Sequence, residues 1–246
     1  MDFLRQLTRV KMTLRHVLYI SYLIPAARLG AYVPDILRLS IVDGDKAFVS
    51  VVILQSAEVH LSTLPFPRFT YNQVNIRTYV KDPHSGSQAV YFLKSGVTSP
   101  VISLVTRVVG IPWQHISATT EMSERNQNKR ASYFVSGDWA GEFSIEVAED
   151  PRQAAALPPF RDTESAIDYL IRPLVGCYGI TGHIRRFRIF HPEVSPLFGL
   201  LEQFRFPLFQ SMNLTDEIEK PHSVLLVPEA HFSIYMPPDR VKGTPT

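Results

Sequence analysis

Short apolar runs separated by turn-forming residues recur along most of the chain. Residues 16–24 (HVLYISYLI) are aromatic and β-branched, as strands prefer. Residues 39–61 contain two apolar runs on either side of Asp43-Gly44, a dipeptide typical of a hairpin turn. Residues 74–82 and 88–96 flank the segment PHSGS and predict another hairpin. The pattern therefore predicts a chain built mostly from antiparallel strands.

Helical signals are confined to a few short segments. In residues 98–110 (TSPVISLVTRVVG), Thr98 or Ser99 can cap a helix, Pro100 suits its first turn, and Gly110 suits the position just after its end. Shorter helices are predicted within residues 25–34 and 162–171. The apolar positions of the first helix fall on one face: Val101, Leu104, Val105 and Val108. The fold class predicted is α+β, dominated by sheet, in one domain over residues 1–246.

Composition and net charge say little about the fold but argue against some classes of binding partner. The chain has 246 residues, 45% hydrophobic and 20% charged, which is ordinary for a globular protein. With 25 basic and 23 acidic residues, the net charge of +2 gives no electrostatic case for nucleic acid or an anionic membrane. A single cysteine, Cys177, excludes an intramolecular disulfide. The apolar run VLYISYLI is too short to cross a bilayer, so we interpret it as the first strand and expect a cytoplasmic protein.

Several common signatures of chemistry are missing from the sequence. It has no glycine-rich phosphate loop, no dinucleotide fingerprint and no nucleophile elbow of the G-x-S-x-G type. The eight histidines are scattered, and none shows the spacing of a helical metal site. We therefore expect neither a cofactor nor a metal site.

An unusually polar stripe follows one face of a predicted strand. Gln73, Asn75 and Arg77 alternate along residues 71–79, so their side chains point the same way, between Tyr71 and Tyr79. If this face is buried, its polar groups require partners or a ligand. The alternative is a strand with one face in solvent, which needs neither.

Three stretches together resemble a known family. They are LRHVLYISYLIPAARLGAYVP at residues 14–34, YNQVNIRTYV at residues 71–80, and GIPWQH at residues 110–115. Their order and spacing are similar to those of the acetoacetate decarboxylase-like superfamily, and in particular of the uncharacterised bacterial YqjF-like family of unknown function. The resemblance extends from about residue 14 to residue 240. It implies an acetoacetate decarboxylase-like sheet or barrel with a few short helices.

The resemblance also implies that the decarboxylase chemistry is absent. In acetoacetate decarboxylase a lysine forms a Schiff base with a ketone, and a neighbouring cation lowers the pKa of that lysine. Carried over by position, the family's arginine falls on Arg15, its glutamate on Gln73, its Schiff-base lysine on Trp113 and the activating neighbour on Gln114. An indole nitrogen is only a donor and cannot form an imine. We therefore predict no catalytic residue for this reaction and leave open whether the protein is an enzyme.

Three hypotheses remain open for the function. In the first, the protein binds a small organic acid or carbonyl compound without covalent catalysis. In the second, it is an enzyme of another type, a lyase or hydratase, with Glu121 as a base or Lys94 as a displaced Schiff-base residue. In the third, it self-associates through the aromatic stretch 197–212, which includes Phe204 and Phe209, to give a homo-oligomer. The ligand-binding residues predicted for the first hypothesis are Arg15, Tyr71, Gln73, Asn75, Arg77, Trp113 and Gln114.

Within this set, Trp113 has two possible roles. Its indole could stack on a ligand and help to close a cavity, or it could be a large core residue that fills the former pocket.

Overall fold

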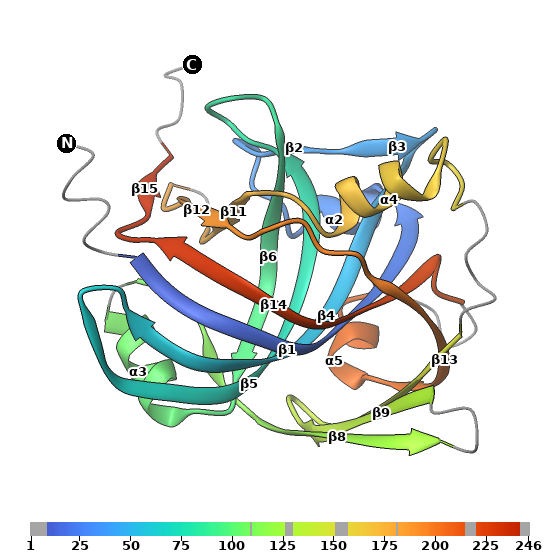
Figure 1. Ribbon diagram of the computed structural model, residues 1–246. Coiled ribbons are helices and arrows are strands. Elements are labelled where there is room, and N and C mark those ends of the chain that lie inside the picture. The colour runs from blue at the N-terminus through green and yellow to red at the C-terminus, as the bar shows by residue number, and fades with distance from the viewer. Residues whose placement is uncertain are drawn as a thin grey trace.

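The computed structural model describes residues 9–108, 110–125, 130–150, 157–180, 182–214 and 220–241 (Figure 1). Its helices are α2 (Ala27–Gly30), α3 (Pro100–Val108), α4 (Thr163–Leu170) and α5 (Pro207–Ser211). Its strands are β1 (Arg9–Pro25), β2 (Arg38–Leu39), β3 (Ile41–Asp43), β4 (Lys46–Leu61), β5 (Leu64–Lys81), β6 (Gln88–Val97), β7 (Gln114–His115), β8 (Ser117–Arg125), β9 (Arg130–Asp138), β10 (Glu142–Glu149), β11 (Val175–Tyr178), β12 (Arg185–Phe190), β13 (Leu197–Arg205), β14 (Ser223–Tyr235) and β15 (Asp239–Arg240). The predicted α+β chain with mostly antiparallel strands is confirmed.

The central strands close into a barrel. Neighbouring strands pair in the order β12-β11-β6-β5-β4-β1-β14, and β14 pairs again with β12 to complete the ring. The closing pairs join Ile189 to Ile234 and Phe190 to Ser233. Around the ring only β11 and β6 run parallel. Closure gives the barrel an inside and an outside, and alternate residues of each strand face one or the other.

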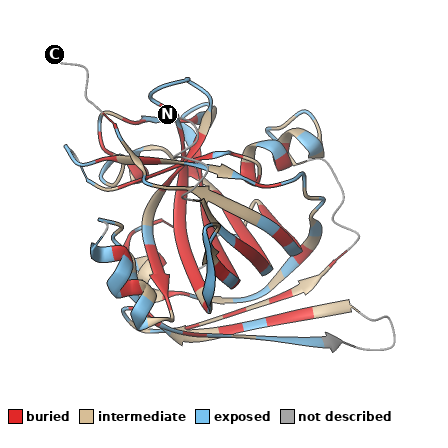
Figure 2. Cartoon of the chain, turned by 60° about the vertical axis from the view of Figure 1, so that its left-hand side comes forward, coloured by how far each residue is buried: buried red, intermediate tan, exposed pale blue. Residues whose placement is uncertain are grey.

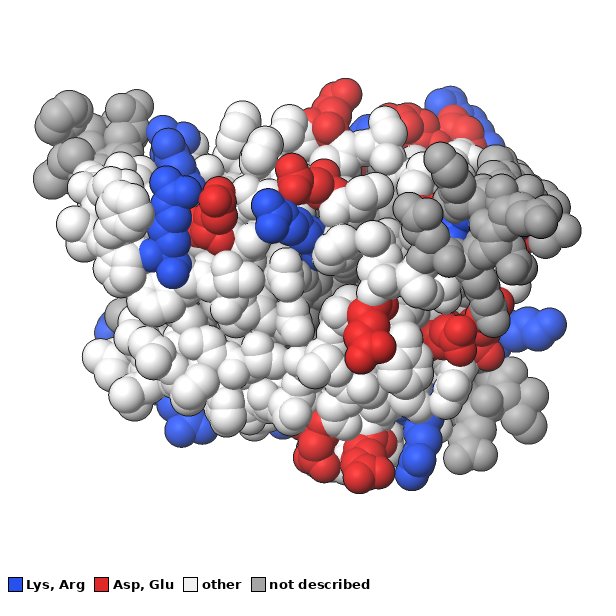
Figure 3. Space-filling view, turned by 60° about the horizontal axis from the view of Figure 1, so that its bottom comes forward, with Lys and Arg blue, Asp and Glu red and all other residues white. Residues whose placement is uncertain are grey.

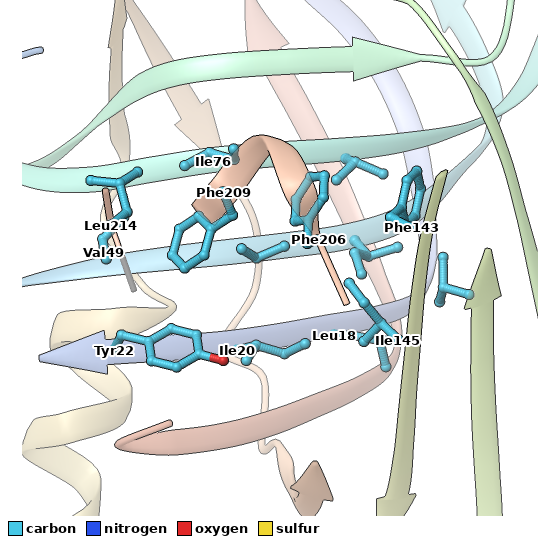
Figure 4. Close-up of a cluster of buried hydrophobic side chains, with 14 of the residues drawn as sticks. Leu18, Ile20, Tyr22, Val49, Ile76, Phe143, Ile145, Phe206, Phe209 and Leu214 are labelled. Atoms are coloured by element: carbon cyan, nitrogen blue, oxygen red, sulfur yellow. The ribbon is translucent and has the colours of Figure 1, made fainter. Parts of the chain in front are cut away.

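A second sheet covers part of the barrel's outside. Strands β13, β10, β9 and β8 continue from β14, and their apolar side chains pack with α5 against β1, β4 and β5 (Figures 1 and 4). Leu18 and Ile20 of β1 meet Ile145 of β10 in this core. Phe206 and Phe209 are fully buried there, and Phe204 is partly buried against them. The suggestion that Phe209 and its neighbours form an exposed patch is therefore wrong, because they fill the space between the two sheets.

The inside of the barrel has a separate core, closed at one end by helix α4 (Figure 2). Val17, Val52 and Val97 line it from β1, β4 and β6, and Leu170 of α4 packs onto them. The carboxylate of Asp162 caps α4 by accepting a hydrogen bond from the backbone N–H of Ser165 at 2.7 Å. The helix predicted over residues 162–171 thus begins at a side-chain cap.

Helix α3 lies where it was predicted but faces the other way. Ser99 Oγ accepts from the N–H of Ile102, and Gly110 has a φ of 80° just beyond the helix. The buried positions are Ser103 and Thr106, and the Ser103 hydroxyl donates to the carbonyl of Trp113 at 3.1 Å. An apolar face with this spacing normally packs onto a core, yet here it is exposed, with exposed fractions of 52% for Val101, 66% for Leu104, 53% for Val105 and 82% for Val108.

A buried ion pair lies on the side of the barrel formed by β11 and β12. Arg186 donates from Nε and Nη2 to the two carboxylate oxygens of Asp82, at 2.7 and 2.8 Å. Ser85 and the backbone N–H of His84 donate to the same carboxylate. Two hydrogen bonds in parallel fix the guanidinium plane, so the pair joins the β5–β6 turn to β12.

Candidate functional site

The polar stripe of β5 is buried inside the barrel. The exposed fractions are 7% for Gln73, 4% for Asn75 and 9% for Arg77. Asn75 lies opposite Val52 of β4 on one side and Ser95 of β6 on the other. Val52 belongs to the inner core, and directly opposed residues share a face of the sheet. The alternative of a solvent-facing strand is therefore wrong, and these polar groups lie in an apolar interior.

Arg77 is the principal charge on this face. Its Nη2 donates to the carbonyl oxygen of Leu170 at 2.7 Å, at the end of α4. Its guanidinium carbon lies 5.1 Å from the ring centre of Tyr19 and 5.7 Å from that of Tyr79. Its Nε is buried without a hydrogen-bond partner, and within the described ranges no carboxylate pairs with it. A buried guanidinium with a spare donor and no counter-ion has the chemistry to accept an anion as a partner.

Neutral polar groups line the same inner face of the barrel as this guanidinium. Gln73 Nε2 donates to Asn75 Oδ1 at 2.9 Å, which fixes both amides. A chain of hydroxyls from Ser21 through Ser50 to Tyr79, with steps of 2.8 and 2.9 Å, ends on the Leu170 carbonyl. Further hydroxyls are buried with no partner in the described part of the chain; they belong to Ser95 and Ser223. Unpaired buried polar groups are costly, so this lining has unused capacity for hydrogen bonds.

Trp113 and Gln114 point in different directions. Trp113 is half-buried against the inner core, with its ring centre 6.5 Å from that of Tyr71 at the start of the stripe. Burial raises the pKa of Tyr71 to about 12, so its phenol stays protonated. Gln114 Oε1 instead accepts from the indole nitrogen of Trp139 at 2.7 Å, and Trp139 belongs to the core between the sheets. Gln114 therefore does not join the polar stripe.

Arg15 also lies apart from the stripe. Its Nε donates to Glu229 at 3.1 Å, and the two side chains are 45% and 52% exposed. Leu14 and Val17 both pack in the inner core. They can do so because β1 has a bulge between Arg15 and Leu18, with His16 at a φ of 53°. Arg15 thus forms an ion pair with Glu229 on the outer surface of the barrel.

The residues considered for other reaction types also lie outside the inner core of the barrel. Lys94 and Glu121 are both exposed, on β6 and β8. Cys177 is buried, and burial raises the pKa of its thiol to about 12, which keeps it from acting as a thiolate. None of these three side chains belongs to the inner core.

The structure adds one residue that sequence reasoning missed. His191 follows β12 directly, is 8% exposed, and stacks on Phe232 of β14 with ring centres 4.6 Å apart. Its Nε2 is buried without a partner among the described residues. Burial lowers its pKa, and the positive charges of Arg77 and Arg172 lower it further. Because this position depends on the pairing of β12 with β14, no local sequence pattern marks it.

The described residues offer neither a cluster of metal ligands nor a membrane-spanning helix. Among the described residues, no group of three or more His, Cys, Asp or Glu side chains is arranged to hold a metal ion. The described helices include none that is long and apolar enough to cross a membrane.

Comparisons with known proteins agree with this architecture. A model of the family DUF2071, described as an uncharacterised conserved protein, matches residues 11–231. An acetoacetate decarboxylase-like enzyme from Sphingomonas wittichii RW1 is similar in structure, with a TM-score of 0.60 and 11% identity over 96% of this chain and 93% of that one. Among curated proteins, no sequence matches this chain.

Two other solved structures are similar to the same degree. The enduracididine biosynthesis enzyme MppR complexed with pyruvate has a TM-score of 0.59 and 12% identity, over 95% of this chain and 91% of that one. Acetoacetate decarboxylase from Legionella pneumophila has a TM-score of 0.58 and 12% identity, over 96% and 87%. At such identities the likeness shows the fold alone, which is acetoacetate decarboxylase-like, as the sequence resemblance implied.

Proposed function

The chain belongs to the DUF2071 family of uncharacterised conserved proteins, and on that premise we propose that it binds a small organic acid or carbonyl compound inside the barrel without forming a Schiff base. The observation that carries this proposal is Arg77, a buried guanidinium with an unpaired Nε and no carboxylate partner among the described residues.

The chemistry of the lining favours an anionic ligand. Burying a charge in an apolar interior is costly unless the charge is paired. The carbonyl of Leu170 and the faces of Tyr19 and Tyr79 offset part of the cost for Arg77. A ligand carboxylate would add the missing negative charge and accept from Nε, in the geometry that guanidinium groups prefer.

The fold supports a ligand of this size and type. The similar structure of MppR contains pyruvate, a small acid with a carbonyl group. The amides of Gln73 and Asn75 line the same inner face as Arg77, and they can bond to carbonyl or hydroxyl oxygens. The absence of a Schiff base is supported by Trp113 and Gln114, which occupy the positions where the resembled family has lysines.

Binding can be tested with a matched pair of arginine variants. Calorimetry against pyruvate, acetoacetate and lactate should give a measurable dissociation constant for at least one acid with the wild-type chain. R77M should abolish that binding, whereas R15M should leave it unchanged, because Arg15 is a surface residue outside the barrel. The proposal fails if no acid binds, or if R15M weakens binding and R77M does not. If R77M does not fold, R77K can be measured instead. It keeps the charge but lacks the planar guanidinium, so it should weaken binding.

A second function, self-association, is favoured by helix α3. Within the stretch 197–212, Phe206 and Phe209 are buried. The exposed apolar face of α3 therefore offers a better surface for self-association. Figure 3 brings forward the end of the molecule where α3 lies and shows a broad area without charged side chains. We propose a second copy of this chain as the partner, because a twofold axis pairs such a face with itself and a net charge of +2 repels a second copy only weakly.

Light scattering of the eluting protein tests this second proposal. The wild-type chain should have a mass of at least twice 27.9 kDa, and the double variant L104S/V108S should elute as the monomer. L64S is the control, since Leu64 is an exposed apolar residue on β5 rather than on α3. A monomeric wild-type chain at high concentration would exclude self-association.

A further inference from the structure

A buried histidine, His191, lies against the inner wall of the barrel. The residue follows β12 and continues the inward face of Phe187 and Ile189, since alternate residues of an extended segment share a side. Ile189 lies opposite Ile234, which packs on the inner core, and the His191 ring stacks on Phe232 of the same strand at 4.6 Å. The imidazole is therefore held against the wall of the barrel interior.

The hydrogen bond made by Nδ1 of His191 determines whether Nε2 carries a proton. His191 Nδ1 lies 2.8 Å from the carbonyl oxygen of Pro192. A carbonyl oxygen can only accept, so Nδ1 carries the proton, and in the neutral ring Nε2 is left with a lone pair. This Nε2 is buried and has no donor among the described residues. The barrel interior thus contains an unused donor on Arg77 and an unused acceptor on His191.

We infer that His191 Nε2 accepts a hydrogen bond from the bound acid, and that the site selects hydroxy acids, whose carboxylate binds Arg77 and whose hydroxyl donates to His191. This inference rests on the proposed function. An acid without a donor group would leave the Nε2 lone pair unpaired inside the barrel, which is unfavourable. A site that is built to bond a hydroxyl discriminates strongly against analogues without one.

The charges near His191 favour a hydroxyl over an ammonium donor. Arg77 on β5 and Arg172 after α4 both act on the imidazole with positive charge. Arg172 is paired to Glu164 and Asp168, on the outer side of α4, while Arg77 has no such carboxylate among the described residues. A ligand ammonium would be repelled by Arg77, so we expect a neutral hydroxyl donor rather than an amino acid.

Calorimetry with ligands that differ only at the donor tests the inference. The probes are lactate, 2-methoxypropionate and alanine, at pH 7.5. For the wild-type chain, we expect lactate to bind at least about tenfold more tightly than 2-methoxypropionate, the effect of about one hydrogen bond, and alanine to bind more weakly than lactate. In H191F the ring still stacks on Phe232 but has no acceptor. Lactate and 2-methoxypropionate should therefore bind to this variant with about equal affinity. H191Q restores an acceptor oxygen and should recover part of the preference.

A second measurement does not depend on the variants folding. The ¹⁵N resonance of His191 Nε2 in the wild-type chain should shift when lactate is added and should not shift with 2-methoxypropionate. Because the acceptor exists only on the neutral ring, the lactate preference should be constant above pH 6.5 and should decline as the solution is acidified below that usual histidine pKa.

The outcomes separate this inference from the proposed function. If acids bind through Arg77 with equal affinity whether or not they carry a hydroxyl, and H191F binds like wild type, the role of His191 is overturned and the acid site stands. If no acid binds, or if binding does not depend on Arg77, the proposed function itself fails.

Discussion

The side chain of Arg77 joins strand β5 to the end of helix α4, through a hydrogen bond of 2.7 Å from Nη2 to the carbonyl oxygen of Leu170. The hydroxyl of Tyr79 donates to the same oxygen at 2.9 Å. The last carbonyls of a helix have no partner within the helix, and positive charge is favourable at this end. One arginine therefore contributes both to closing the barrel and to the charge of its interior.

Replacement of Arg77 by methionine should lower stability as well as remove binding. R77M keeps an aliphatic stem but removes one of the two donors to Leu170, so the free energy of unfolding should fall by about 1–3 kcal/mol. Urea denaturation followed by circular dichroism measures this loss. R15M should cost less than about 0.5 kcal/mol, because Arg15 forms only an exposed ion pair. Equal stability of the two variants would contradict the structural role of Arg77.

The buried pair of Asp82 and Arg186 should make stability depend on pH. Burial alone would raise the pKa of Asp82, but hydrogen bonds from Arg186, Ser85 and His84 outweigh it and hold that pKa below its usual value of 3.8. A pKa lowered by folding contributes stability above the unfolded value and loses it as the pH falls through the folded value. The pair should therefore stabilise the chain above about pH 4 and progressively less below it.

Denaturation of D82N across pH measures this contribution. At pH 7 we expect D82N to be less stable than wild type by about 3 kcal/mol, because Arg186 keeps a buried charge without its main partner. The difference should shrink on acidification below pH 3.8. E229Q, which removes one member of an exposed pair, should show neither effect. A D82N deficit that stays constant down to pH 2 would show that the carboxylate charge is not the cause.

No lysine should be trapped by borohydride in the presence of pyruvate. Trapping reduces an imine to a stable amine, and this requires a neutral lysine next to the ketone. Lys94 is exposed on β6, outside the inner core, and position 113 is an indole. Mass spectrometry should therefore show the unmodified chain. A single adduct that maps to Lys94 would restore the covalent hypothesis.

The two tryptophans should respond differently to a bound acid. Trp113 lies against Tyr71 at the start of the polar stripe, whereas Trp139 belongs to the core between the sheets. With one indole left in each variant, the fluorescence of W139F should change on addition of a binding acid, and that of W113F should stay constant. The opposite result would place the ligand outside the barrel.

The sequence predicted some features well because they are local. The alternation of Gln73, Asn75 and Arg77 correctly placed all three on one face, since an uninterrupted strand keeps a period of two. The turn at Asp43-Gly44 joins β3 to β4, with Gly44 at a φ of 55°. These features depend on neighbouring residues alone.

Other features depend on contacts that no local pattern contains. Arg15 faces outward because a bulge shifts the alternation of β1 by one residue. The apolar face of α3 is exposed because Ser103 and Thr106 are the positions that pack inward. His191 reaches the interior only because β12 pairs with β14, more than 40 positions later in the chain.

The ring of strands is completed by short stretches, Ile189–Phe190 against Ile234–Ser233 and Gly176–Cys177 against Val90–Tyr91. Such brief ladders separate at lower free energy than the long pairings of β1, β4 and β5. The first of these ladders ends directly before His191. Transient separation of these short ladders would admit a small molecule to the barrel interior while the second sheet stays packed on the barrel. Backbone amides in the short ladders should therefore exchange with solvent well before those of β4.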